Sequence, residues 1–297
     1  MTRLSDWMQA SGLARLDAQV LVGTVLGWSR AQQVAHPEQE LRDADLARLN
    51  ALAARLRAGE PLAYVLGERE FYGLTFRVTP DVLIPRPDTE LLVDLALQTF
   101  DALPPLSARR ALDLGTGSGA IAVALAHARP LAQVWALDAS AAALAVAHAN
   151  AQRLLPAQRA GGAIRFVQSN WFSALREAEA AVPRFHCIVS NPPYIAQHDP
   201  HLPALRHEPT LALTGERPSA DGLGDIRHIV TQAADFLHDD GWLLVEHGYD
   251  QADAVRSLLA AQGFRAVFSA RDLAGIERVS GGLCPHPRAT QSAPKIV

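Results

Sequence analysis

The sequence predicts an α/β fold in which an open parallel β-sheet, covered by helices on both faces, follows a small all-helical N-terminal domain. Two observations predict it. From Arg110 onward, short runs of β-forming residues alternate with helical runs, which is typical of parallel sheets with crossover helices. Residues 1–65 show apolar residues at helical spacing only, and glycines such as Gly12 and Gly27 separate the runs.

A linker is predicted between the helical domain and the sheet, at residues 66–88. Within it, residues 71–78 alternate in polarity and are rich in β-forming types, which predicts a strand or a hairpin. Three prolines then stiffen the connection, as in a linker between domains: Pro80, Pro85 and Pro87.

The sheet-forming domain is predicted at residues 89–284. Its first helix, at 90–100, is expected to be capped by Asp88 or Thr89. Six strands are predicted, at residues 111–114, 133–137, 164–168, 185–190, 242–246 and 264–269. Four more helices are predicted among them, at residues 119–128, 139–153, 226–237 and 251–262. The polar tail 285–297 is predicted to be disordered.

Composition narrows the class of function. Hydrophobic residues make up 49% of the chain, which is enough for a sizeable core, and the net charge of −4 gives no basic excess. We therefore expect no stable binding to nucleic acid. Charged residues interrupt the N-terminal segment, and no uncharged apolar run is long enough to span a membrane. With two distant cysteines and no metal-ligand spacing, the sequence predicts a cytoplasmic protein that binds neither a metal nor a membrane.

A glycine-rich loop lies between the first predicted sheet strand and the helix after it, and it reads Asp113-Leu114-Gly115-Thr116-Gly117-Ser118-Gly119-Ala120. Glycines let the backbone pass close to a ligand and leave amide groups at a helix N-terminus. Asp138 ends the next strand, where a carboxylate can accept hydrogen bonds from both ribose hydroxyls. The pattern indicates a nucleoside site. It leaves NAD open, because Gly115, Gly117 and Ala120 also fit the dinucleotide pattern.

The tetrapeptide Asn191-Pro192-Pro193-Tyr194 directly follows a predicted strand, so it should lie at the same carboxyl edge of the sheet. Its two prolines remove backbone donors, and the segment presents carbonyl oxygens together with the Asn191 side chain. The Asn191 side-chain oxygen and the Pro192 carbonyl oxygen can hold the two hydrogens of an amide NH2 group. Tyr194 can lie against the flat amide or offer its ring face to a sulfonium.

Such a pair of acceptors suits methylation of an amide nitrogen. This nitrogen is a poor nucleophile, because its lone pair is delocalised into the carbonyl group. Acceptors aimed at its hydrogens favour the positively charged transition state more than the ground state. They also direct the nitrogen at a methyl group about 3–3.5 Å away, which is the near-attack range.

Together these residues resemble the HemK/PrmC family of protein-(glutamine-N5) methyltransferases, which act on peptide chain release factors. The resemblance runs from about residue 4 to residue 281. It rests on residues 71–74, 84–90, 113–119, 191–194 and 272–279. The segment Ile84-Pro85-Arg86-Pro87-Asp88-Thr89-Glu90, behind a helical N-terminal half, is the most specific part. The tetrapeptide alone is shared with adenine-N6 DNA methyltransferases.

The resemblance implies a seven-stranded class I (Rossmann-like) methyltransferase fold behind a helical N-terminal domain, with S-adenosylmethionine as cofactor. The helical N-terminal domain is our candidate for recognising the protein substrate. The implied cofactor-binding residues are Gly115, Thr116, Gly117, Ser118, Gly119, Asp138, Trp171 and Asn191. The implied substrate is the glutamine in the Gly-Gly-Gln sequence of class 1 release factors, held by Asn191, Pro192, Pro193 and Tyr194. Of these, Asn191, Pro192 and Tyr194 are the catalytic candidates. The family often has Asp at the position of Asn170, and asparagine can still accept a hydrogen bond from an adenine amino group.

Other functions stay open at this point. Adenine-N6 methylation would need a flipped base in the same pocket, and the chain lacks a basic stripe for nucleic acid. A sister family methylates a glutamine of a ribosomal protein and differs at residues 84–90. A nucleoside-binding module that only docks to translation partners would lack activity. The tetrapeptide argues against an oxidoreductase.

Overall fold

The computed structural model describes residues 2–102, 109–178 and 181–285, so the predicted tail beyond Pro285 lies outside the described residues. The chain divides into two compact units. One comprises Met1–Arg69 with Val78–Pro80, and the other comprises Glu70–Arg77 with Asp81–Val297.

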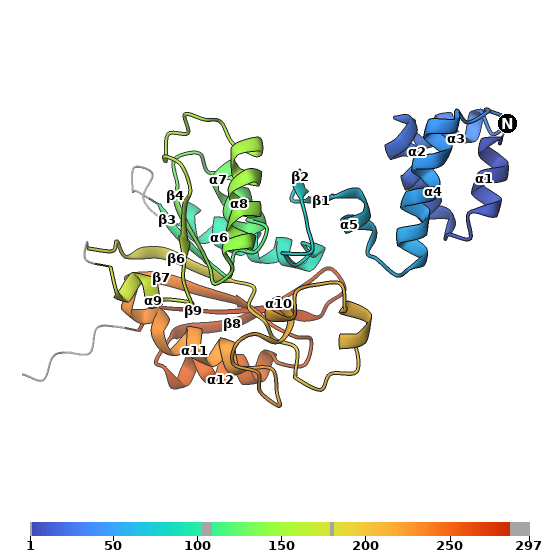
Figure 1. Cartoon of the computed structure of the whole chain (residues 1–297). Coiled ribbons are helices and arrows are strands. Elements are labelled where there is room, and N and C mark those ends of the chain that lie inside the picture. The colour runs from blue at the N-terminus through green and yellow to red at the C-terminus, as the bar shows by residue number, and fades with distance from the viewer. Residues whose placement is uncertain (1, 103–108, 179–180, 286–297) are drawn as a thin grey trace, which may run out of the picture. The chain divides into compact units, whose positions relative to one another are not determined.

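The first unit is a small helical bundle, as its apolar spacing predicts (Figure 1). Its helices are α1 (Leu4–Ala10), α2 (Arg15–Leu26), α3 (Arg30–Ala35), α4 (Asp43–Arg57) and α5 (Leu62–Leu66). They enclose their own apolar core, in which Leu21 and Leu49 are fully buried. The indole of Trp7 also lies in this core and donates a hydrogen bond to Asn50 Oδ1 at 2.9 Å.

A hairpin leads from the bundle to the second unit, which confirms the prediction at residues 71–78. Its strands are β1 (Glu68–Phe71) and β2 (Leu74–Arg77). The turn places Tyr72 in the left-handed region, at φ 53°. The Tyr72 backbone N–H donates to Glu90 Oε1 at 2.9 Å and its hydroxyl to Asp94 Oδ1 at 2.7 Å. These two bonds attach the turn to the helix that follows the linker.

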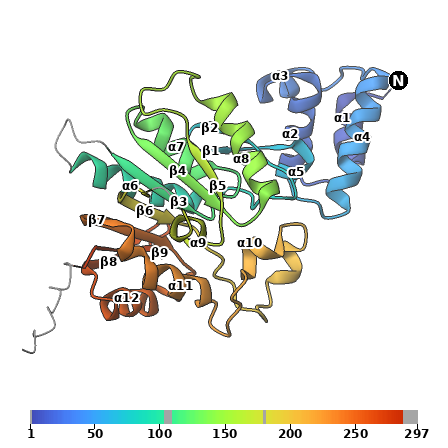
Figure 2. The same ribbon diagram turned by 60° about the vertical axis from the view of Figure 1, so that its left-hand side comes forward.

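The second unit is built on a seven-stranded sheet with the order β5-β4-β3-β6-β7-β9-β8 (Figures 1 and 2). The strands are β3 (Arg110–Leu114), β4 (Gln133–Asp138), β5 (Arg165–Gln168), β6 (Phe185–Ser190), β7 (Leu237–Glu246), β8 (Arg265–Arg271) and β9 (Glu277–Leu283). The first five run parallel, and β9 is antiparallel to both of its neighbours. This is the seven-stranded class I methyltransferase fold that the resemblance implied.

Helices cover both faces of the sheet, as the alternation of strands and helices predicts. The helices are α6 (Glu90–Asp101), α7 (Ala120–Ala128), α8 (Ala141–Leu154), α9 (Ser173–Arg176), α10 (Thr210–Thr214), α11 (Gly224–Gln232) and α12 (Ala252–Ala261). Three short 3₁₀ turns accompany them: η1 (Pro87–Thr89), η2 (Leu202–Leu205) and η3 (Ala233–Asp235). Successive strand residues face opposite layers: Ala111 packs in the core under α6 and α7, and Leu112 packs in the core under α11 and α12.

The six predicted strands are confirmed, but β9 was missed. Its sequence contains Gly281 and Gly282, and glycine pairs are typical of turns. In the sheet, a Cβ at Gly281 would lie 2.5 Å from Leu244 Cδ2 on the paired strand β7, so the missing side chain allows the close approach.

Two helix predictions were wrong in detail. The helix predicted at 226–237 ends at Gln232, and Leu237 already pairs with Phe185 as the first residue of β7. The polar residues after Leu237 are typical of a turn. They nevertheless belong to β7, and the pairing between β6 and β7 shifts in register there. At the other helix, neither Asp88 nor Thr89 caps α6 with its side chain, because Pro87–Thr89 forms a 3₁₀ turn.

Within the described ranges, none of the helices combines the length and apolar character that a membrane crossing requires.

The fully buried Asn150 of α8 connects the hairpin to the glycine-rich loop. Its Oδ1 accepts from the Arg77 backbone N–H at 2.8 Å, and its Nδ2 donates to the carbonyl oxygens of Arg77 and Ser118, each at 2.9 Å. We predict that Asn150→Ala lowers the free energy of unfolding by about 1–3 kcal/mol, because buried polar groups lose their partners. Urea denaturation measures this. The exposed Gln98→Ala on α6 is the control, and equal stability of both variants would contradict the prediction.

Candidate functional site

The site lies where the strand order reverses. Going along the chain, β4 and β5 add on one side of β3, whereas β6 and β7 add on the other. Leu114 at the end of β3 pairs with Leu137 of β4 and with Ser190 of β6. Gly115 and Asn191 therefore leave the sheet side by side, on neighbouring strands about 4.8 Å apart. Ligands of open α/β sheets bind at such a switch point, outside the carboxyl ends of the strands.

The glycine-rich loop turns tightly over the end of β4. The backbone N–H groups of Gly115 and Thr116 both donate to the Leu137 carbonyl oxygen, at 2.8 and 2.9 Å. The Gly117 N–H donates to Asp138 Oδ2 at 2.8 Å. Gly115, Gly117 and Gly119 all have positive φ, which only glycine adopts easily.

The loop offers its backbone rather than its side chains. The Thr116 hydroxyl donates to Asp113 Oδ2 at 2.6 Å, and both Thr116 and Ser118 are buried. A Cβ added at Gly117 would meet no atom within 4 Å, so this part of the loop faces open space. A ligand would therefore meet peptide groups here.

The carboxylate of Asp138 accepts hydrogen bonds from two backbone N–H groups. Besides Gly117 N, the Ser140 N–H donates to its Oδ1 at 2.9 Å. Burial raises the pKa of the carboxyl group, and these hydrogen bonds oppose the rise. Each oxygen retains a lone pair, as expected for a carboxylate that receives two ribose hydroxyls.

Trp171 lies against the same loop. Its ring carbon Cζ3 is 3.4 Å from the position that a Cβ of Gly115 would occupy. The indole Nε1 donates to the buried Asp225 Oδ1 at 3.0 Å, and the Trp171 backbone has an unusual positive φ of 51°. The ring is thus fixed beside the glycines, where a flat heterocycle can stack.

Asn170 is engaged with protein groups on both sides of its amide. Its Nδ2 donates to Glu216, and its Oδ1 accepts from Arg217 at 3.2 Å. An adenine amino group that donates to Asn170, as the sequence leads us to expect, would therefore share the Oδ1 atom with Arg217.

The Asn191 side chain is oriented by a residue 102 positions earlier. Its Nδ2 donates to the Thr89 hydroxyl at 3.0 Å, and Thr89 is buried. Among the described residues, no hydrogen bond reaches Asn191 Oδ1. Since the nitrogen side of the amide is occupied, the oxygen side is the one available to a ligand. Pro192 and Pro193 contribute no N–H group that would compete for it.

Tyr194 closes the tetrapeptide and is fixed at both ends. Its carbonyl oxygen accepts from Gln251 Nε2 at 3.0 Å, and its hydroxyl donates to Glu246 Oε1 at 3.4 Å. Burial raises the pKa of the phenol further above its ordinary value, so the hydroxyl keeps its proton.

The segment at residues 84–90 is joined to the long loop after the tetrapeptide. Glu208, which is buried, accepts from the Ile84 N–H at 3.1 Å and from the Arg86 guanidinium at 2.5 Å. Asp88 lies 3.6 Å from Arg278 of β9. These contacts fix the position of Thr89, and with it the amide of Asn191.

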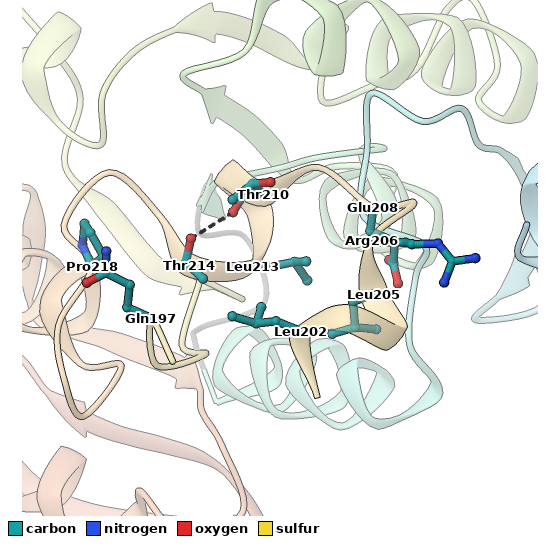
Figure 3. Close-up of a pocket in the computed structure, with 9 residues that line it drawn as sticks. All are labelled: Gln197, Leu202, Leu205, Arg206, Glu208, Thr210, Leu213, Thr214 and Pro218. Carbon is teal, nitrogen blue, oxygen red and sulfur yellow. Dashed lines mark hydrogen bonds between the residues drawn. The ribbon is translucent and has the colours of Figure 1, made fainter. Parts of the chain in front are cut away.

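The same loop contains a hollow of about 280 Å³ (Figure 3). Leu202 and Leu205 of η2 and Leu213 of α10 form its apolar part. Its other lining residues are Gln197, Arg206, Glu208, Thr210, Thr214 and Pro218. The hollow begins three residues after Tyr194, and the Ile195 N–H donates to the Leu213 carbonyl oxygen at 3.1 Å. It is therefore built on the chain that leaves the tetrapeptide.

Sequence reasoning missed three parts of this site: the Thr89 hydroxyl, the Gln251 amide and Asp225. Each acts through a hydrogen bond to a residue at least 54 positions away. The type of a residue does not indicate which distant residue it will hydrogen-bond in the folded chain. The segment 84–90 stands out in the sequence by its prolines and by its resemblance to the family, and neither feature indicates a contact with Asn191.

Two family models and several relatives match this chain. The profile of the PrmC N-terminal domain matches residues 4–67, and that of the methyltransferase small domain matches residues 89–207. A release factor glutamine methyltransferase from Burkholderia pseudomallei is 54% identical over 95% of this chain and 96% of its own. The protein of that name from Escherichia coli is 44% identical over 93% of this chain and 94% of its own. Among solved structures, a METTL16 methyltransferase domain superposes with a TM-score of 0.52 at 19% identity, covering 73% of this chain and 90% of that one, a likeness in fold.

Asp225 holds Trp171 and also lies 3.4 Å from Arg217 of the loop. We predict that Asp225→Ala weakens the local structure at residues 169–174 and 215–224 by about 1–3 kcal/mol, because both donors lose a buried acceptor. Amide hydrogen exchange followed by mass spectrometry should show faster exchange in these two segments. Asp235→Ala, which removes a carboxylate that is 63% exposed, is the matched control. The same exchange in both variants and the parent would refute the role of Asp225.

Proposed function

Because the chain belongs to the release factor glutamine methyltransferase family, we propose that it methylates the glutamine side chain in the Gly-Gly-Gln sequence of class 1 release factors. The observation that carries the proposal is the orientation of Asn191. Its amide nitrogen is bound to Thr89, so that its oxygen is available at the end of β6, next to the glycine-rich loop.

The substrate amide is held by acceptors alone. Asn191 Oδ1 and the Pro192 carbonyl oxygen each accept one hydrogen of the glutamine NH2 group. As positive charge develops on the nitrogen, these hydrogen bonds strengthen, which lowers the barrier. Pro193 stiffens the backbone between the acceptors and Tyr194, whose ring lies against the planar amide. The methylated nitrogen then loses a proton readily, and asparagine does not need to act as a base.

The residues present fit S-adenosylmethionine as the methyl donor. The backbone of Gly115, Thr116, Gly117, Ser118 and Gly119 faces open space at Gly117, and Asp138 retains lone pairs for two ribose hydroxyls. Trp171 offers a fixed ring to the adenine, and Asn191 follows β6, the strand that pairs with β3 before the glycine-rich loop. When bound, this group supplies a methyl carbon on a sulfonium, the electrophile that an amide nitrogen requires.

The helical bundle is proposed as the part that recognises the release factor. Its support is a separate apolar core, which leaves its outer surface available, and the match of residues 4–67 to the N-terminal domain of the family. The absence of stable nucleic-acid binding stays a prediction.

One experiment tests the proposed function directly. The protein is incubated with radiolabelled S-adenosylmethionine and, in parallel, with purified release factor, ribosomal proteins and DNA, and the label is mapped by mass spectrometry. The proposal expects one methyl group on the glutamine of the Gly-Gly-Gln sequence. Label only in DNA would indicate adenine methylation, and label only in a ribosomal protein would indicate the sister activity.

We predict that Asn191→Ala lowers kcat on release factor by at least about 100-fold, because one of the two acceptors is removed. The dissociation constant of S-adenosylmethionine, measured by calorimetry, should stay within about 3-fold, since the rest of the cofactor site is intact. Wild-type kcat in this variant would exclude Asn191 as the acceptor.

We predict that Asp138→Ala raises the dissociation constant of S-adenosylmethionine about 10- to 100-fold, because charge-assisted hydrogen bonds to the ribose are lost. The control is Asp101→Ala, which removes a carboxylate that is 57% exposed at the end of α6. Thermal melting without cofactor reveals any general loss of structure. Equal affinity of Asp138→Ala and Asp101→Ala for the cofactor would reject the ribose assignment.

A further inference from the structure

The side chain of Gln251 joins three separate parts of the backbone at the carboxyl edge of the sheet. Gln251 lies between β7 and α12, at the N-terminal end of the helix. Its Oε1 accepts from the Gly248 N–H at 2.7 Å, and its Nε2 donates to the carbonyl oxygens of Tyr194 at 3.0 Å and Asp221 at 2.8 Å. One amide group therefore connects the tetrapeptide to the segment after β7 and to the long loop.

A single orientation of this amide satisfies all three partners. Gly248 offers an N–H donor, whereas Tyr194 and Asp221 offer carbonyl oxygens. If the amide were turned over, a donor would face a donor at Gly248 and an oxygen would face an oxygen at both carbonyl groups. Both hydrogens of the Gln251 NH2 group are used in these bonds. Gln251 therefore has no hydrogen left to donate to a ligand, which points to a role in holding the backbone.

The peptide group that follows Tyr194 is fixed on both of its sides. Its carbonyl oxygen accepts from Gln251, and its N–H, which belongs to Ile195, donates to the Leu213 carbonyl oxygen at 3.1 Å. The two prolines before Tyr194 have a fixed φ, so the backbone is restrained before and after this residue. The bond from the Tyr194 hydroxyl to Glu246, at 3.4 Å, is long for an O–H donor. The bond at the carbonyl group is thus the stronger restraint on the ring.

The long loop packs closely on the same carbonyl group. Gly222 has a φ of 70°, and a Cβ there would lie 2.1 Å from the Tyr194 carbonyl oxygen and 2.9 Å from Gln251 Nε2. The preceding residue, Asp221, is held in its turn by the Ser219 hydroxyl, which donates to Asp221 Oδ1 at 2.8 Å. The absence of a side chain at Gly222 allows this turn to pack against the hydrogen bond between Gln251 and Tyr194.

We propose that Gln251 is a positioning residue for methyl transfer, which holds the carbonyl group of Tyr194 and so keeps the Tyr194 ring against the amide of the substrate glutamine. This inference rests on the proposed function. Without the Gln251 amide, the Tyr194 carbonyl group loses its donor, and the peptide group after Tyr194 is free to rotate. A displacement of about 1 Å in a group that orients the substrate can lower the rate about 100-fold. The loss should therefore appear in methyl transfer and not in cofactor binding.

Gln251→Glu and Gln251→Ala test the proposal. Glutamate keeps the shape and the acceptor for Gly248 but places a carboxylate against two carbonyl oxygens, and alanine removes all three hydrogen bonds. Both variants should lower kcat on release factor about 10- to 100-fold, while KM for release factor and the dissociation constant of S-adenosylmethionine stay within about 3-fold. The control is Gln262→Glu, the same change of charge at the exposed C-terminal end of α12, which should match the parent.

A double-mutant cycle shows whether Gln251 acts through the ring of Tyr194. In Tyr194→Ala the ring to be positioned is gone, so the addition of Gln251→Ala should lower kcat by less than about 2-fold more. In Tyr194→Phe the ring remains, and the addition of Gln251→Ala should still lower kcat by about 10-fold or more. Single-turnover reactions with radiolabelled S-adenosylmethionine measure these low rates. General damage to the structure would lower the rate equally in both backgrounds.

Calorimetry and thermal melting complete the test. Each Gln251 variant should be folded at the assay temperature and should bind as many equivalents of S-adenosylmethionine as the parent does. Parent-like kcat in both Gln251 variants overturns the proposal, and so does an effect of Gln251→Ala that is equally large in the Tyr194→Ala and Tyr194→Phe backgrounds. Failure of the parent itself to methylate release factor would instead overturn the proposed function, and this inference with it.

Discussion

The pairing of β3 with two parallel neighbours is the constraint on which the rest of this structure depends. Leu114 pairs with Leu137 on one side and with Ser190 on the other, so three strand ends meet at one edge. The register brings together groups that are 76 residues apart in sequence, Gly115 and Asn191. The Ser190 hydroxyl donates to the Leu114 carbonyl oxygen at 2.8 Å and fixes this pairing at its last residue. A shift by one residue would exchange the faces of the strand and separate the proposed nucleoside site from the proposed acceptor.

The segment at residues 84–90 acts as a brace for that edge. It does not join the sheet, yet it reaches three later parts of the chain. Thr89 accepts from Asn191, Arg86 pairs with Glu208 of the long loop, and Asp88 lies near Arg278. The prolines hold this backbone in one conformation, so its side chains lose little further freedom when they bind. This explains in physical terms why a proline-rich linker can also support the candidate functional site.

Local patterns predicted most of the fold, because strands, helices and the glycine-rich loop each have a sequence signature. Local patterns failed where contacts with a neighbouring strand decide whether a residue belongs to a strand. Gly281 sits in a strand because Leu244 leaves no room for a Cβ, and Leu237 is a strand residue because it pairs with Phe185. In the site, Gly115, Asp138 and Asn191 follow from their places at strand ends. The hydrogen bond that orients Asn191 could not be predicted in this way. Its acceptor is the hydroxyl of Thr89, and only the tertiary fold brings that hydroxyl close to Asn191.

Two carboxyl groups at this edge oppose stability. Asp113 at the end of β3 and Glu246 at the end of β7 are fully buried, and burial raises the pKa of each to about 7. Among the described residues, each has one oxygen without a hydrogen-bond partner, Oδ1 and Oε2 respectively. A buried acceptor left unpaired costs about 1–3 kcal/mol, and an apolar side chain would pack on these strands without that cost. Asp113 supports the glycine-rich loop through Thr116, and Glu246 supports the tetrapeptide through the Tyr194 hydroxyl. One of these carboxyl groups contacts the glycine-rich loop and the other contacts the tetrapeptide. We therefore attribute the free-energy cost of burying them to their role in orienting the polar groups of the candidate site, because a chain selected for stability alone would not keep them.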